Sequence, residues 1–274
     1  MTEAKRQLDS MLEGVKSNTY KTNITVEQKA KSASPKKIFT VEGEIGAGKT
    51  ELATHLAARL TQRGFSVCLV LEPVQQWKDV GILQAFYADP TRYAYSFQTY
   101  VFATRVMAIH NAMSSKPNAD IYILERSPAT DPVFMALQEV APLERAMYDT
   151  WCCAWQALSA IDYSKATAIY LRTSPDICMQ RVAKRAREGE IMTSGVEKTK
   201  TTATAAGGVS AEYQALLRRA NEAFFLGQHQ GEFPRLPPCP IKTVIEVAHA
   251  KADSDFRADN PAGRQIINDV LRDM

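Results

Sequence analysis

The residue pattern that points most directly to chemistry is a glycine-rich segment that matches G-x-x-x-x-G-K-[ST]. Glycines let the backbone curl so that successive N–H groups face phosphate oxygens, and the following helix adds its positive end. In such a loop Lys49 reaches the β- and γ-phosphates, and the Thr50 hydroxyl binds Mg²⁺. The pattern predicts a nucleoside triphosphate site, and ATP is expected because the guanine motif N-K-x-D is absent. The loop comprises Gly43, Glu44, Ile45, Gly46, Ala47, Gly48, Lys49 and Thr50.

Two carboxylates follow short apolar runs. Glu72 comes after Val67–Leu71, and Glu125 comes after Ile121–Leu124 and directly before Arg126. Ligands of open α/β sheets bind at the carboxyl ends of the strands, so both carboxylates should emerge near the phosphate loop. Phosphorylation of a hydroxyl needs one carboxylate near the metal and another to accept the proton. The alternative is that these residues cap helices or face solvent.

The elements that must position these groups follow an alternating order. Continuous apolar runs typical of buried parallel strands are Lys37–Val41, Val67–Leu71, Ile121–Leu124, Thr167–Leu171 and Thr243–Val247. Helical patterns include Thr50–Gln62, Phe97–Met113, Leu143–Ile161, Pro175–Arg187 and a closing helix over Asn260–Met274. This alternation predicts a doubly wound α/β fold of the P-loop kinase type, with a five-stranded parallel sheet and helices on both faces.

Two segments do not fit the alternation. Residues 1–36 carry more basic than acidic residues and few large apolar ones, which predicts a disordered basic tail. Residues 193–210 are rich in Thr, Ala, Gly and Ser and are expected to form a flexible insertion. One catalytic domain is therefore expected over 37–274.

The composition excludes several classes of protein. A net charge of +3 is too small to argue for nucleic acid, and no apolar run approaches the ~20 residues of a membrane helix. Five cysteines without metal-ligand spacing favour reduced thiols inside the cell. We expect a cytoplasmic protein that binds neither nucleic acid nor membrane, with a mitochondrial location left open.

Several motifs in order make the chain resemble the deoxynucleoside kinases, from about Ile38 to the C-terminus apart from the insertion. The motifs are Gly43–Thr50, Glu72-Pro73-Val74 with Trp77, Tyr87-Ala88-Asp89-Pro90, Phe97-Gln98-Thr99-Tyr100, Glu125-Arg126-Ser127, Tyr170–Pro175 and Arg181–Arg187. The resemblance implies ATP-dependent phosphorylation of the 5′-hydroxyl of a deoxynucleoside.

The resemblance also implies roles for individual residues. Glu72 would be the general base, Arg126 would hold that carboxylate and the incoming phosphoryl group, and Lys49 would bind phosphate. Glu125 and Thr50 would organise Mg²⁺. A short lid over residues 181–192 would neutralise the transferred phosphoryl group with Arg181, Arg185 and Arg187. The loop that wraps the adenine of ATP would contain Asp255 and Phe256.

The same resemblance implies a nucleoside pocket. Gln98 would pair with the base edge, and Tyr87 with Glu190 would hold the sugar 3′-hydroxyl. Trp77 and Val101 would line the pocket, although Trp77 and Tyr87 could be ordinary core aromatics.

Base choice is expected from three further positions. Arg105 and Asp131 match the charged pair of the deoxycytidine and deoxyguanosine branch. Such a pair favours amino-bearing bases over thymine, unless it is only a structural salt bridge. Met135 stands where the family usually stacks an aromatic ring on the base, while Phe134 precedes it by one position.

Other interpretations stay open. They are a broad or thymidine-preferring deoxynucleoside kinase, a nucleoside monophosphate kinase, and an ATP-binding module without catalysis. Family members are homodimers, and a helix with Trp151, Cys152 and Trp155 could supply the interface or could serve core packing.

Overall fold

The computed structural model describes residues 37–159, 161–185 and 209–247, together with positions 261, 264, 265, 268 and 272. Five parallel strands form one sheet in the order β2-β3-β1-β4-β5. The strands are β1 (Lys37–Gly43), β2 (Val67–Val70), β3 (Ile121–Glu125), β4 (Thr167–Leu171) and β5 (Thr243–Val247). The prediction of an α/β fold with a five-stranded parallel sheet is confirmed.

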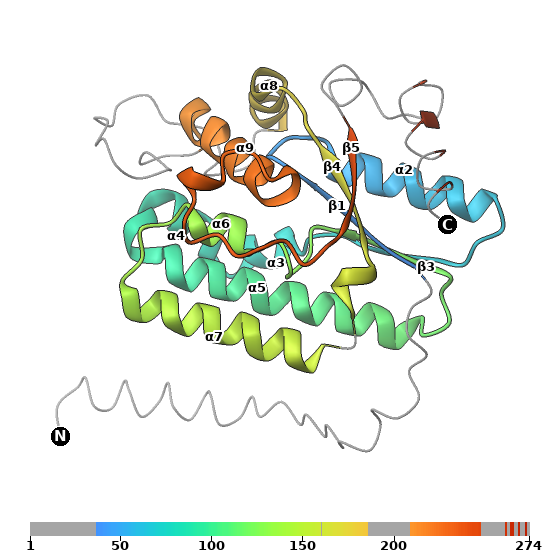
Figure 1. The fold of residues 1–274 in the computed structure, drawn as a ribbon, viewed down its shortest axis with the longest axis horizontal. Coiled ribbons are helices and arrows are strands. Elements are labelled where there is room, and N and C mark those ends of the chain that lie inside the picture. The colour runs from blue at the N-terminus through green and yellow to red at the C-terminus, as the bar shows by residue number, and fades with distance from the viewer. Residues whose placement is uncertain are drawn as a thin grey trace. The chain divides into compact units, whose positions relative to one another are not determined.

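Helices lie on both sides of this sheet (Figure 1). They are α2 (Lys49–Gln62), α3 (Val74–Asp79), α4 (Ile82–Ala88), α5 (Pro90–Ser115), α6 (Pro132–Ala136), α7 (Pro142–Leu158), α8 (Pro175–Arg185) and α9 (Ala211–Leu226), with short 3₁₀ turns η2 (Tyr163–Lys165) and η3 (Gln230–Glu232). The predicted helix over 97–113 is longer than expected, because the Asp89 side chain accepts a hydrogen bond from the Arg92 N–H (3.1 Å) and caps α5 at Pro90.

Alternating strand residues fill two separate cores. Ile121 and Ile123 of β3 pack with Leu52 and Leu56 of α2 on one face of the sheet. On the other face, Tyr122 belongs to a larger core that includes side chains of α5 and α9. Because successive strand side chains point to opposite faces, every central strand is buried on both sides.

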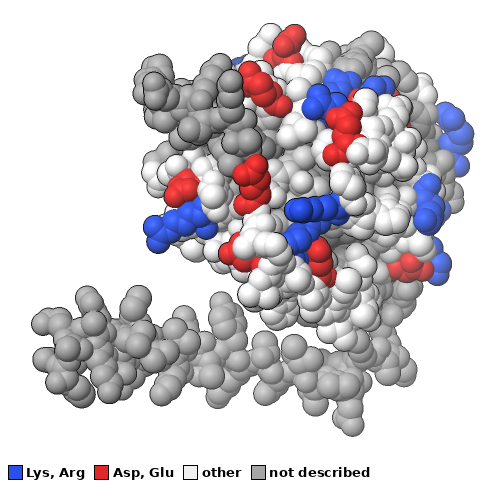
Figure 2. Space-filling model, turned by 60° about the vertical axis from the view of Figure 1, so that its left-hand side comes forward, with Lys and Arg blue, Asp and Glu red and all other residues white. Residues whose placement is uncertain are grey.

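A second helical layer covers α5. The Phe102 ring of α5 meets the rings of Tyr148 and Trp155 of α7 edge-on, with centroids 6.0 and 5.8 Å apart. Along the part of the chain that the structure describes, no helix is long and apolar enough to cross a membrane. Acidic and basic side chains lie interspersed on the described surface that Figure 2 shows.

The predicted tail (1–36), most of the lid and the insertion (193–210) lie almost wholly outside the described residues. Of the predicted closing helix, five residues are described, and all five are helical: Pro261, Arg264, Gln265, Asn268 and Arg272.

Candidate active site

A cavity of about 710 Å³ opens at the carboxyl ends of the strands, where the predicted phosphate loop lies. The loop requires glycine at two places. A Cβ atom on Gly43 (φ 143°) would lie 2.7 Å from the Leu171 carbonyl oxygen, and one on Gly46 (φ 84°) would lie 2.5 Å from that of Cys178. Only glycine fits such close approaches, so the loop keeps its curled shape.

Contacts from distant elements hold the loop in place. The Lys49 ammonium donates to the Glu44 carbonyl at 2.8 Å, and burial lowers the pKa of Lys49 to about 8. The Thr173 hydroxyl and the Arg181 guanidinium both donate to the Ala47 carbonyl at 3.0 Å. The loop is therefore tied to the segment after β4 and to α8.

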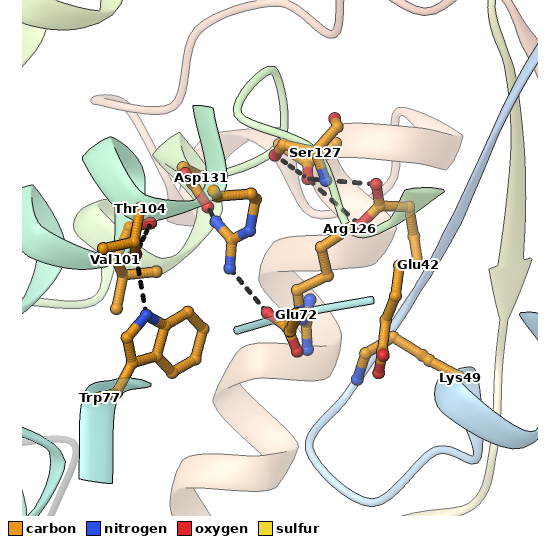
Figure 3. Close-up of polar contacts among 12 residues, drawn as sticks. Glu42, Lys49, Glu72, Trp77, Val101, Thr104, Arg126, Ser127 and Asp131 are labelled. Atoms are coloured by element: carbon orange, nitrogen blue, oxygen red, sulfur yellow. Dashed lines mark hydrogen bonds and ion pairs between the residues drawn. The ribbon is translucent and has the colours of Figure 1, made fainter. Parts of the chain in front are cut away.

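Glu72 lies two residues beyond β2 and points into the cavity with 13% of its side chain exposed. Its Oε1 atom is 2.6 Å from Nη2 of Arg105 and 3.5 Å from Nε of Arg126 (Figure 3). Burial alone would raise the pKa of Glu72, but the charges of Arg105, Arg126 and Lys49 outweigh burial and lower that pKa below its ordinary value. The carboxylate is therefore ionised at neutral pH and can accept a proton.

Arg126 has an unusual backbone for a residue with a side chain, at φ 59°. Its N–H donates to the Val41 carbonyl at 3.1 Å, and its Nη2 donates to the Gly43 carbonyl at 2.7 Å. Its guanidinium lies 4.5 Å from the centre of the Phe134 ring. These contacts aim the side chain at Glu72 and at the phosphate loop.

Glu125 lies on the opposite side of β3 from Tyr122 and faces α2. The Thr50 hydroxyl donates to Oε1 of Glu125 at 2.6 Å, and both residues line the cavity. Among the described residues, no group of three or more His, Cys, Asp or Glu side chains could hold a metal ion by itself. A pair of oxygen ligands nevertheless fits Mg²⁺, which keeps several waters and binds substrate phosphates.

The far end of the cavity contains the predicted nucleoside residues. Trp77, Tyr87, Gln98, Val101, Arg105 and Asp131 all line it. Arg105 forms ion pairs with both Glu72 and Asp131, and its guanidinium lies 5.8 Å from the centre of the Trp77 ring. One guanidinium thus joins two carboxylates that line the cavity, Glu72 just beyond β2 and Asp131 directly before α6.

Asp131 is almost completely buried, with 2% of its side chain exposed. One of its oxygens pairs with Arg105, while Oδ2 forms no hydrogen bond within the described part of the chain. A buried oxygen of this kind is costly unless a donor reaches it. Nε of Arg105 is likewise buried without a hydrogen bond among the described residues, so the pair leaves one acceptor and one donor open.

Comparison with known proteins identifies the family of this chain. The sequence model of the deoxynucleoside kinases matches residues 39–199, which is more than half of the chain. The chain belongs to the deoxynucleoside kinase family. It is therefore an ATP-dependent kinase of deoxynucleosides. This family membership argues against a nucleoside monophosphate kinase and against an ATP-binding module without catalysis.

Three relatives align with most of the sequence of this kinase. A probable deoxycytidine kinase of fowlpox virus is 29% identical over 238 residues, 85% of this chain and 86% of its own. Deoxycytidine kinase 2 of Gallus gallus is 27% identical over 263 residues, with 85% and 88% covered. A thymidine kinase of Ictalurid herpesvirus 1 is 30% identical over 192 residues, with 68% and 73% covered.

One predicted residue of this kinase lies elsewhere. Met135 is fully buried in a cluster with Phe102, Tyr148 and Cys152 and does not line the cavity. Phe134 lines it instead. The expectation that Met135 touches the base is therefore corrected: α6 begins at Pro132, and its single turn directs position 135 toward α7 rather than the cavity.

The structure adds lining residues that the sequence did not single out, and it leaves others undescribed. Tyr213 of α9, whose pKa burial raises to about 12, and Lys184 of α8 both line the cavity beside the predicted Arg181 and Arg185. The spacing of Lys184 from Arg181 along α8 could have revealed it, whereas nothing local marks Tyr213. The predicted residues outside the described ranges are Arg187, Glu190, Asp255 and Phe256.

Proposed function

We propose that Glu72 is the general base of this kinase. The supporting observation is that Glu72 is kept ionised by Arg105 and Arg126 in the cavity that also contains Lys49. Its carboxylate takes the proton of the 5′-hydroxyl while that oxygen bonds to the γ-phosphorus of ATP. The bond from phosphorus to the bridging oxygen breaks, and ADP leaves with the electron pair.

Charge on the transferred phosphoryl group is balanced by the chain's own cations. Lys49 and Arg126 approach it from the loop and from β3, and Arg181 with Arg185 approach it from α8. Arg187 would belong to the same lid. Cations fixed in a cavity stabilise charge that develops in the transition state without having to reorganise. Asp255 and Phe256 are proposed to contact the adenine.

Thr50 and Glu125 are proposed to hold Mg²⁺, because their oxygens already meet beside the phosphate loop. When bound, the ion would neutralise phosphate charge. The Thr50 hydroxyl and the Glu125 carboxylate would supply the protein's oxygen ligands to the ion.

We propose that deoxycytidine and purine deoxynucleosides are preferred over thymidine. The observation that carries this preference is the buried, unsatisfied Oδ2 of Asp131. An exocyclic amino group of cytosine, adenine or guanine can donate to that oxygen, whereas thymine carries no amino group and its O4 atom is a second acceptor. The viral thymidine kinase among the relatives makes thymidine the competing candidate.

The rest of the nucleoside pocket follows from the lining residues. Gln98, buried at the floor, is proposed to pair with the base edge, and Tyr87 with Glu190 is proposed to bind the 3′-hydroxyl. Trp77 is fixed by a hydrogen bond from its indole N–H to the Thr104 hydroxyl (2.8 Å) and would form one wall.

An activity panel tests the base preference. The wild type and Asp131→Ala are assayed with ATP and Mg²⁺ against the four deoxynucleosides, with Asp79→Ala, an exposed acid, as the matched control. The ratio of kcat/KM for deoxycytidine over thymidine should fall ~10-fold or more in Asp131→Ala and stay unchanged in the control. A wild type that prefers thymidine would refute the proposed preference.

We also propose that the kinase forms a homodimer through α7. Three large apolar side chains at spacings of four are exposed along this helix: Leu143 (72%), Met147 (45%) and Trp151 (57%). Cys152 and Trp155, named with Trp151 from the sequence, pack toward α5 instead. Trp151→Glu should give a monomer by sedimentation velocity, while Val80→Glu, at an apolar site exposed elsewhere, should not.

A reducing compartment such as the cytoplasm is the proposed location, because all five cysteines are free thiols. Cell fractionation with an antibody against the chain tests this proposal, and recovery from an oxidising compartment would contradict it.

A further inference from the structure

Glu42 is a buried carboxylate to which the reaction described above assigns no role. It is the next-to-last residue of β1, immediately before the phosphate loop, with 1% of its surface exposed. A buried carboxylate is stable only with hydrogen bonds and positive charge around it. The residues that supply them to Glu42 therefore indicate which part of the site Glu42 holds in place.

The hydrogen-bond partner of Glu42 belongs to the segment that follows Arg126. The Thr130 hydroxyl lies 3.2 and 3.1 Å from the two carboxylate oxygens of Glu42 and 2.9 Å from the Ser127 carbonyl oxygen, so its single proton is shared among these acceptors. The Thr130 N–H donates to the Ser127 carbonyl at 3.0 Å, and the Ser127 N–H reaches back to the Thr130 hydroxyl at 3.4 Å. Through Thr130, Glu42 therefore holds the turn that begins at Ser127.

Three consecutive residues at the end of β1 converge on Arg126. The Val41 carbonyl accepts its backbone N–H, and the Gly43 carbonyl accepts its guanidinium. Glu42, between them, fixes the adjoining turn through Thr130. Because Arg126 has φ 59°, a conformation that side-chain-bearing residues rarely adopt, its backbone stays in place only if the surroundings impose it.

Charge adds to these contacts. Burial raises the pKa of Glu42 to about 7, although the positive charges of Arg126 and Arg105 and the Thr130 hydrogen bond act in the opposite direction. Among the described residues, Glu42 also helps to raise the pKa values of Tyr163 and Cys239. Above pH 7 the carboxylate is mostly ionised and attracts the two guanidinium groups; below pH 7 it is mostly neutral.

We propose that Glu42 is a positioning residue, which acts through Thr130 to hold Arg126 in its reactive conformation against Glu72 and the phosphate loop. This inference rests on the proposed role of Arg126. Glu42 lies too deep to touch the nucleoside or ATP, so its loss should change kcat more than KM.

The test compares Glu42→Gln, Thr130→Val and Thr130→Ser with the wild type. Glu42→Gln keeps the shape and removes the charge, and Thr130→Val removes the connecting hydroxyl that Thr130→Ser restores. We expect kcat to fall ~10- to 100-fold in the first two variants, with KM for nucleoside and ATP within about threefold. Thr130→Ser should recover most of the activity.

The pH dependence of kcat separates a positioning role from a loss of folding stability, because a less stable fold would not remove the acid limb of the profile. In the wild type, kcat should fall as the pH drops below about 7, since Glu42 becomes neutral there while Glu72, with its lowered pKa, stays ionised. This acid limb should disappear in Glu42→Gln. An unchanged kcat and an unchanged acid limb in Glu42→Gln would overturn the proposal.

Two further variants separate the alternative explanations. Glu222→Gln alters another buried carboxylate that pairs with Arg172 and Arg218 outside the cavity, and it should lower stability without changing kcat per folded molecule. Arg126→Ala should lower kcat ~10³-fold or more while leaving a measurable rate, and adding Glu42→Gln to it should cause no further loss in kcat. If Arg126→Ala keeps most of its activity, the proposed function of Arg126 fails; if only Glu42→Gln does so, the positioning role alone fails.

Discussion

Replacing Glu72 with glutamine changes the side chain's charge and proton affinity but hardly its shape. The carboxamide oxygen can still accept the hydrogen bond that Arg105 donates at 2.6 Å, and Asp131 continues to neutralise Arg105. The cavity should therefore keep its geometry, and KM for the nucleoside should change by no more than a few-fold.

The expected loss is in the chemical step. A positioned general base contributes ~10²–10⁴-fold in rate, which corresponds to about 3–5 kcal/mol of transition-state stabilisation. Since Glu72 is the carboxylate that the structure places between the two guanidinium groups at the cavity, we expect the upper part of this range for Glu72→Gln.

The assay is rapid-quench measurement of a single turnover with saturating ATP and Mg²⁺, because steady-state kcat can report product release instead of chemistry. Glu139→Gln, at an exposed position away from the cavity, serves as the matched control. A Glu72→Gln enzyme that keeps its single-turnover rate within threefold of the wild type would show that another group accepts the proton.

Further predictions concern the loop and the pocket. Gly46→Ala should abolish ATP binding, measured by calorimetry, because its Cβ would lie 2.5 Å from the Cys178 carbonyl oxygen; retained affinity would contradict the loop geometry. ATP binding above pH 8 should be accompanied by proton uptake, seen as a buffer-dependent enthalpy, since the free Lys49 with a pKa of about 8 must regain its charge. No buffer dependence would argue against this. Met135→Ala should cost about 2–5 kcal/mol in urea unfolding with little change in KM, whereas Phe134→Ala should mainly raise KM for the nucleoside. A raised KM in Met135→Ala, with a loss of stability alone in Phe134→Ala, would show that Met135 contacts the base.

Local patterns determined much of the fold and part of the site. The five strands were predictable because buried parallel strands are continuous apolar runs, and the sheet order then brings their ends together. The phosphate loop was predictable because its residues are consecutive, so the glycine spacing in one short segment sets the backbone conformation of the whole loop. Glu72 and Glu125 followed from their positions at strand ends.

Other parts depended on packing between distant segments. The choice between Phe134 and Met135 rests on the direction of a five-residue helix, where a shift of one position moves a side chain from the cavity into the contact with α7. Tyr213 joins the cavity from α9 and is the last of the described lining residues along the chain.

The sequence by itself determined that this protein binds a nucleoside triphosphate and that two carboxylates and an arginine stand beside it, because those requirements are met by short runs of residues. Only the tertiary structure decided that Arg105, already expected to pair with Asp131, also pairs with Glu72, and that Glu42 is buried near Arg126. These are contacts across the fold, and a charge acquires its partner and its pKa only when folding has removed the water between them.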